Sequence, residues 1–202
     1  MRFFVLVLGL AVFVDATAAA EDERPSGAIT GYYYAMRDEP DFGVGVATLD
    51  YKRWHFEARY NYEAENAGSA FVGYKFKGGD ALTFEITPIV GALFGSSRGV
   101  VPGVEASVAW GPFDAYVEAE YVDDRRQPGT SYYYAWSELA WAPVEWLRVG
   151  LVGQRTNTVD TGREFQRGAF AQATIQRLTF GVYFFNPDSA ARYVIGSVGA
   201  SF

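Results

Sequence analysis

The stretch Trp54-His55-Phe56-Glu57-Ala58-Arg59-Tyr60-Asn61-Tyr62-Glu63 alternates apolar or aromatic side chains with charged or polar ones along its whole length. A period of two is that of an extended strand, whose successive side chains point to opposite faces. Its length of about ten residues and its aromatic ends are typical of a strand that crosses a bilayer obliquely. If the pattern recurs along the chain, the protein is expected to sit in a membrane.

The same alternation recurs along the rest of the chain, with turn-forming residues between the runs. Twelve strands are predicted, an even number as in single-chain bacterial barrels. The fold class that follows is all-β, an antiparallel up-and-down transmembrane β-barrel with short periplasmic turns. The predicted strands are Gly27–Arg37, Phe42–Tyr51, Trp54–Glu63, Ser69–Phe76, Ala81–Phe94, Val100–Trp110, Phe113–Val122, Tyr132–Trp141, Trp146–Thr156, Phe165–Gln176, Leu178–Asn186 and Arg192–Phe202.

The connections alternate in length, which supports the same architecture. Tight turns fall on one side, whereas the longer connections Asp123–Ser131 and Asn157–Glu164 fall on the other. Outer-membrane barrels have short periplasmic turns and longer outer loops. A soluble sandwich or lipocalin-like barrel gives the same alternation, but soluble strands usually run about 5–6 residues. The longer strands and the aromatic residues at their ends favour the membrane barrel.

The N-terminus predicts export. Met1-Arg2, the apolar run Phe3–Val14 and the small residues Ala18–Ala20 have the order of a secretory signal peptide, assigned to residues 1–20. The alternative is a permanent anchor, which needs about 20 apolar residues and so is disfavoured by length. The mature chain is then expected to begin at Glu21, with residues 21–26 as a short periplasmic lead-in and residues 27–202 as the barrel domain.

Composition excludes some classes of partner. The formal net charge is -7, and only three of the basic residues are lysines. Binding to nucleic acid requires clustered Lys and Arg to neutralise phosphates, so no nucleic-acid partner is expected. The chain has no Cys, so its stability after export must come from sheet closure and packing.

The last strand carries a recognisable signature. It alternates from Val194 to the terminal Phe202, although Tyr193 falls on the face opposite Phe202. An alternating strand that ends in an aromatic residue resembles the C-terminal signature of outer-membrane β-barrel proteins of Gram-negative bacteria. The resemblance implies a location in the bacterial outer membrane, contact with outer-membrane lipid, and recognition of Phe202 as an assembly signal by the barrel assembly machinery.

The charged faces of the strands are expected to line the lumen, because charges facing lipid cost several kcal/mol near the middle of the membrane. Counting outward from the tight turn at residues 142–145 predicts an ion pair of Glu138 with Arg148, and counting from the loop at residues 64–68 predicts one of Glu57 with Lys75. Arg59 and Glu85 fall on one transverse row on either side of Gly73, which leaves room for a third pair between them. The same counting also places Glu105 opposite Glu118, which predicts an unpaired acidic patch. The predicted lumen charges are Glu57, Arg59, Lys75, Glu85, Glu105, Glu118, Glu120, Glu138 and Arg148.

Two functions remain open at this point. The first is a narrow porin-like pore for small solutes, preferentially cationic or neutral, because an acidic lining attracts cations. The second is a structural or binding barrel without a transport role, whose lumen is closed by the ion pairs and by Tyr116, Trp136 and Phe170. No metal site is predicted, since no ion-binding loop spacing accompanies the acidic patch, and no cofactor motif is present.

The sequence gives little support for an enzyme. Gly95-Ser96-Ser97-Arg98-Gly99 matches the G-x-S-x-G string, but that motif requires a turn from strand to helix, and a hairpin loop is predicted here. His55, the single histidine, is expected about a membrane thickness away from Ser97. A nucleophile needs its base within hydrogen-bonding reach, so no catalytic residue is assigned.

Overall fold

The computed structural model describes residues 24–158 and 162–202. The predicted signal peptide and the expected mature start at Glu21 lie outside these residues. Among the residues described, no helix has the length and apolar composition needed to cross a membrane.

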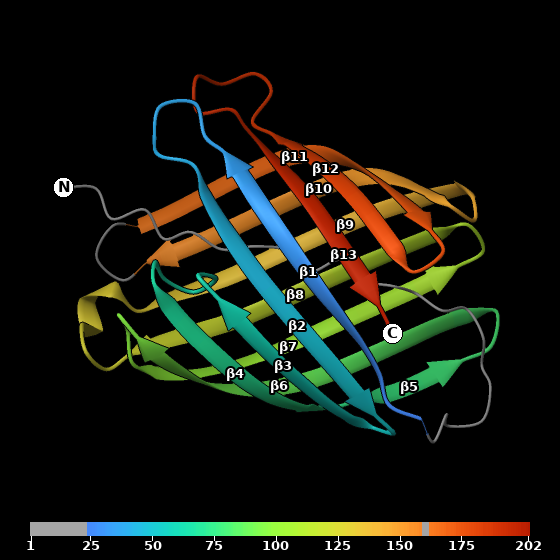
Figure 1. Cartoon of the computed structure of the whole chain (residues 1–202), viewed down its shortest axis with the longest axis horizontal. Helices are drawn as coiled ribbons and strands as arrows, with labels where there is room; N and C mark the ends of the chain where they lie inside the picture. The colour runs from blue at the N-terminus through green and yellow to red at the C-terminus, as the bar shows by residue number, and fades with distance from the viewer. Residues whose placement is uncertain (1–23, 159–161) are drawn as a thin grey trace.

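One antiparallel sheet accounts for nearly all of the described chain, and it closes on itself. The first and last strands pair, and β4 pairs with β6. In Figure 1, β1, β2 and β13 cross in front of β8 to β11, so the sheet forms two facing walls. The elements are β1 (Ser26–Ala35), β2 (Phe42–Tyr51), β3 (Trp54–Tyr60), β4 (Ala67–Tyr74), β5 (Phe76–Gly79), β6 (Leu82–Gly95), β7 (Gly99–Trp110), β8 (Phe113–Asp124), η1 (Pro128–Thr130), β9 (Tyr132–Val144), β10 (Leu147–Thr158), β11 (Gly162–Ile175), β12 (Leu178–Phe185) and β13 (Tyr193–Ser201).

β4 and β5 are two parts of one strand, so the predicted twelve-stranded antiparallel barrel is confirmed. Both segments pair with β6 in one continuous register, from Ala67 opposite Gly95 to Gly79 opposite Thr83. That register puts Pro88 across from Tyr74, where the ladder is interrupted. Proline has no backbone N–H to donate. Lys75, the residue after Tyr74, donates its N–H to the carbonyl oxygen of Arg53 at 2.8 Å.

The strand that begins at Trp54 is shorter than predicted. β3 ends at Tyr60, and Asn61 has a φ of 61°, in the left-handed region that asparagine tolerates better than most residues. The Asn61 side chain then holds the turn, because it donates to the carbonyl oxygen of Gly43 and accepts from the N–H of Asn66, both at 2.8 Å. The prediction of a strand up to Glu63 was therefore wrong.

The outer face of the barrel is apolar. Large side chains point outward on most strands, with exposed fractions of 59% for Ile29 and Leu139 and 63% for Leu151. A soluble protein rarely exposes contiguous apolar surface on this scale, whereas a transmembrane barrel presents such a band to lipid. The inward face holds the buried aromatic and charged side chains.

The two ends of the barrel differ. At one end, here named the turn end, tight hairpins join β2 to β3, β5 to β6, β7 to β8, β9 to β10 and β11 to β12. At the other, the loop end, lie the longer connections. The C-terminal Phe202 lies at the turn end, where it exchanges two backbone hydrogen bonds of 2.9 and 3.0 Å with Gly27.

Candidate functional site inside the barrel

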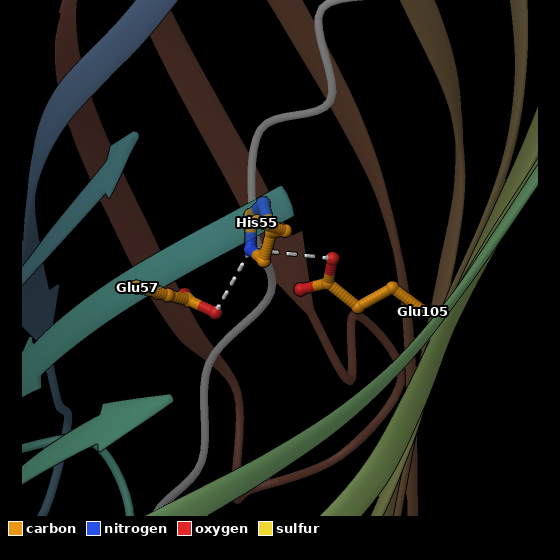
Figure 2. Close-up of side chains that lie close together, drawn as sticks. All are labelled: His55, Glu57 and Glu105. Atoms are coloured by element: carbon orange, nitrogen blue, oxygen red, sulfur yellow. Dashed lines mark ion pairs between the residues drawn. The ribbon is translucent and has the colours of Figure 1, made fainter. Parts of the chain in front are cut away.

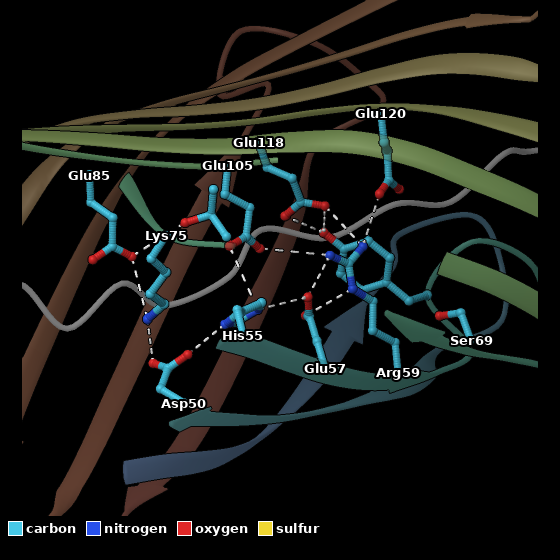
Figure 3. A network of polar contacts seen from close by, with 12 residues as sticks. Asp50, His55, Glu57, Arg59, Ser69, Lys75, Glu85, Glu105, Glu118 and Glu120 are labelled. Atoms are coloured by element: carbon cyan, nitrogen blue, oxygen red, sulfur yellow. Dashed lines mark hydrogen bonds and ion pairs between the residues drawn. The ribbon is translucent and has the colours of Figure 1, made fainter. Parts of the chain in front are cut away.

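Arg59 on β3 is the centre of a network of charges inside the barrel. Its side chain is fully buried, and the carboxylates of five glutamates lie 2.8 to 3.9 Å from its guanidinium nitrogens. Figure 3 shows His55, Glu57 and Arg59 reaching inward from one wall and Glu105, Glu118 and Glu120 from the facing wall. The five glutamates are Glu57, Glu63, Glu105, Glu118 and Glu120.

The guanidinium also contacts two aromatic rings. Its central carbon lies 4.2 Å from the ring centre of Tyr62 and 4.3 Å from that of Phe71, both within the range of a cation–π contact. Phe71 has room because Gly91 lies opposite it on β6, and a Cβ at Gly91 would come within 2.5 Å of the ring. The guanidinium thus packs against two rings while it meets carboxylates from both walls.

The short connection between β3 and β4 folds into the lumen and joins the network. The Tyr62 hydroxyl lies 2.8 and 3.0 Å from the two carboxylate oxygens of Glu118. The Ser69 hydroxyl lies 2.8 Å from the Glu63 carboxylate, and the Tyr132 hydroxyl donates to the Glu63 carbonyl oxygen at 2.7 Å. This segment therefore bridges β3 and β4 to β8 and β9 across the interior.

A second group of charges lies toward the turn end. His55 Nδ1 is 2.7 Å from an Asp50 carboxylate oxygen. Lys75 Nζ contacts Asp50 at 2.5 Å and Glu85 at 3.4 Å, and the exposed Lys77 contacts Glu85 at 2.8 Å. The side chains of Asp50 and Glu85 are about 30% exposed, so this part of the network meets water.

Arg148 on β10 forms a separate centre. Its guanidinium lies 2.5 Å from Asp114 and 2.6 Å from Glu138, donates to Gln172 at 2.9 Å, and sits 4.9 Å from the ring centre of Phe170. Aromatic rings fill the space beside it, with centroid distances of 4.4 to 6.1 Å between neighbours. These rings are Tyr34, Phe42, Trp136, Phe170, Tyr183, Phe185 and Tyr193.

The predicted pairs fare differently in the structure. Glu138 and Arg148 are in contact as expected, but Glu138 lies opposite Val152 and not opposite Arg148, because β9 and β10 extend further into their turn and the register shifts near it. Glu105 does lie opposite Glu118. The acidic patch is not unpaired, however, since Arg59 reaches it from the facing wall.

Two predicted pairs are wrong. Glu57 lies opposite Phe71 and pairs with Arg59, while Lys75 pairs with Asp50 and Glu85. Arg59 and Glu85 are likewise separate. The error comes from the connection after β3. The strand that follows it was predicted to begin at Ser69, but β4 begins at Ala67, and this shift of two residues displaces the register of β4 against β3.

Several participants were missed by the sequence analysis. Asp50 lies directly opposite His55 across the tight β2–β3 hairpin, and counting outward from that turn would have found it. Glu63 was expected at the end of a strand, and Asp114 has no direct cross-strand acid or base neighbour. The G-x-S-x-G string falls at the loop between β6 and β7, at the opposite end of the barrel from His55.

Neither a protein-family model nor a curated protein sequence matches the chain. Solved structures do match. The KdgM porin is similar at 12% sequence identity with a TM-score of 0.64, covering 87% of this chain and 98% of that one. The KdgM porin in complex with disordered oligogalacturonate is similar at 10% identity with a TM-score of 0.65 and the same coverage. The chain thus has the fold of an outer-membrane porin over nearly the whole length of that barrel.

Proposed function

We propose that this chain is an outer-membrane channel for small neutral or cationic solutes, with a lumen that the Arg59 network holds narrow. The observation that carries the proposal is the excess of carboxylates over basic groups inside a closed barrel with an apolar outer face. Rings of acidic side chains favour cations in pores. The apolar outer face supports a location in the lipid of the outer membrane.

The same excess of acid limits the class of solute. The similar KdgM porin was solved with oligogalacturonate, an acidic oligosaccharide. A lumen with five glutamates around one arginine would repel such an anion, so we do not extend that ligand to this chain. A small cation or a neutral solute meets no such barrier.

The turn end is assigned to the periplasm in this proposal, as in other barrels with short turns on that side. Phe202 lies at that end and is 60% exposed, which supports its proposed role as the residue read by the barrel assembly machinery. Export through the signal peptide at residues 1–20 belongs to the same proposal.

A second candidate is a barrel that does not conduct. It is favoured by one observation, the fully buried contacts of Arg59 with Glu118 and Glu120, which join β3 to β8 across the lumen. In this case the short loops would serve as a binding or structural surface. The two candidates predict opposite results in one experiment.

The test is single-channel recording in planar bilayers with a KCl gradient across the membrane. The channel proposal expects steady conductance steps and a reversal potential that favours K⁺ over Cl⁻. Replacing both Glu105 and Glu118 with Gln should move the reversal potential toward zero, because the field in the lumen weakens.

The matched control is Glu145→Gln. Glu145 is exposed in the turn between β9 and β10, so the same chemical change there should leave selectivity unaltered. Silence of the folded protein at high density overturns the channel proposal and supports the closed barrel. A conducting protein whose selectivity is equal in both variants overturns the assignment of these glutamates to the solute path.

A further inference from the structure

Three side chains from two facing walls converge at the turn end of the lumen. His55 Nε2 lies 3.8 Å from a carboxylate oxygen of Glu57 and 3.8 Å from one of Glu105. One ligand atom from each residue can be chosen such that all lie within 4.8 Å of one another. Figure 2 shows the imidazole pointing between the two carboxylates.

The imidazole nitrogen that faces this space lacks a partner. His55 is 4% exposed, and its Nε2 has no hydrogen-bond partner among the described residues. The Glu105 oxygen nearest to it is Oε2, at 3.8 Å, whereas Glu105 Oε1 lies 3.9 Å from Arg59. A buried polar atom without a partner costs about 1–3 kcal/mol. A buried imidazole nitrogen left without a partner between two carboxylates points to a ligand in that space.

The other nitrogen of the imidazole is already fixed. Nδ1 lies 2.7 Å from Asp50, and a carboxylate at that distance favours the tautomer in which Nδ1 carries the proton. Nε2 then presents a lone pair to the space between Glu57 and Glu105. A carboxylate behind a ligating histidine is the usual outer-shell arrangement at metal sites, because it orients the ring and raises its basicity.

The charge around this space calls for a cation. Arg59 meets five glutamates, Lys75 contacts Asp50 and Glu85, and Lys77 contacts Glu85, so seven carboxylates face three basic side chains. With His55 neutral and all seven acids ionised, negative charges outnumber positive ones by four in this largely buried place. A divalent ion bound by Glu57 and Glu105 would offset two of these charges.

We propose that His55, Glu57 and Glu105 bind a divalent transition-metal ion, with Zn²⁺ as the reference metal. Ligand atoms held at about 2.0–2.2 Å from one ion lie roughly 3 to 4 Å from each other, and the two distances from Nε2 already fall in that range. Imidazole nitrogen with carboxylate oxygen suits Zn²⁺ and its neighbours better than Mg²⁺ or Ca²⁺. Water completes the coordination.

Glu57 can serve both the ion and Arg59. Its Oε2 accepts from Arg59 Nη2 at 2.9 Å, and a carboxylate oxygen has a second lone pair for the metal. The Asp50 side chain, which contacts His55 Nδ1, is about 30% exposed at the turn end, so water reaches the group next to the site. The competing arrangement is a protonated His55 that pairs directly with the two carboxylates and leaves no place for an ion.

The single histidine makes the test direct. Protein without an affinity tag, labelled with ¹⁵N only in histidine and stripped of metal with EDTA, gives the signals of one imidazole. Titration with Zn²⁺ should shift the Nε2 resonance and saturate at one ion per barrel, with the same stoichiometry by elemental analysis after dialysis. Co²⁺ should give the visible absorption of a site with nitrogen and oxygen ligands.

Glu105→Gln should abolish this binding, and Glu138→Gln should not, because Glu138 is an equally buried acid in the Arg148 centre. Asp50→Asn keeps all three ligands and should weaken binding by about 10–100-fold, the usual effect of removing an outer-shell partner. If Glu105→Gln does not fold, the affinity of the Asp50→Asn variant for Zn²⁺ tests the proposal in its place. A doubly protonated imidazole whose resonances do not respond to Zn²⁺ overturns the proposal, whether or not the barrel conducts.

Discussion

The Arg59 and Arg148 centres each place an arginine among acidic side chains in the lumen, but they differ in burial and in charge balance. Arg148 meets two carboxylates, an amide and a ring, and its side chain is 13% exposed. Arg59 is fully buried and meets five carboxylates. The first centre is close to charge balance and borders a packed aromatic cluster, whereas the second has excess acid and spans both walls.

The two centres differ in their expected cost to stability and, in our proposal, in their function. A buried ion pair contributes little net stability even when it is balanced, because desolvation offsets the attraction. An acid-rich centre is more costly still, since glutamates 105 and 118 oppose each other across neighbouring strands. The Arg148 centre packs against an aromatic cluster, whereas in our proposal the cost of the Arg59 centre is offset by its interaction with a cation.

The largest effect is expected from removing the two arginines in turn. Arg59→Met leaves several buried carboxylates without a cation and should cost at least about 5 kcal/mol or prevent folding, beyond the 3–5 kcal/mol usual for breaking a buried pair. Arg148→Met should cost about 2–4 kcal/mol, because water reaches part of that centre. Urea unfolding in lipid vesicles, followed by tryptophan fluorescence, measures both. Equal losses would contradict the distinction between the centres.

Neutralising one acid in each centre is expected to change the free energy of unfolding in opposite directions. In metal-free protein, Glu105→Gln should leave the free energy of unfolding unchanged or raise it by about 1 kcal/mol, since it removes a like-charge contact. Glu138→Gln should lower it by about 1–3 kcal/mol, because a charge-assisted hydrogen bond to Arg148 is lost. The same unfolding assay applies, and destabilisation by both substitutions would show that the acid of the Arg59 centre is needed for folding.

The smallest effect is expected at an exposed arginine. Arg167 pairs with Asp188 at 2.6 Å, but both side chains are about two-thirds exposed. Surface ion pairs contribute little, because water screens them and the side chains lose freedom. Arg167→Met should therefore leave the unfolding midpoint unchanged. A clearly lower midpoint would mean that the distance between the charges, and not their burial, determines how much such ion pairs stabilise the fold.

The fold was largely predictable because its determinants are local. Alternation assigns inward and outward faces, and turn residues mark the strand ends, so β2 was predicted with its observed bounds, Phe42–Tyr51. The interruption between β4 and β5 lies opposite Pro88. The residue that faces Pro88 could be identified only once the register was known.

The site was predictable in its composition and less so in its pairings. A turn displaced by two residues shifts every partner across the hairpin by four, as happened for Glu57 and for Glu138. The contacts of Arg59 with Glu118 and Glu120 join strands that are not neighbours in the sheet. Counting along neighbouring strands cannot supply these contacts, because they form across the lumen of the closed barrel.

The pairing of β1 with β13 has a consequence for how the molecule forms. Ala28 lies opposite Ser201, and Ala35 lies opposite Val194, so the seam joins residues from the two extremes of the chain. Contacts between residues so distant in sequence form slowly. Until the last strand arrives, the growing sheet has two open edges that can pair with other chains. β13 pairs with both β1 and β12, so the barrel closes only when this strand is in place, and a truncation that removes it should leave an open, aggregation-prone sheet.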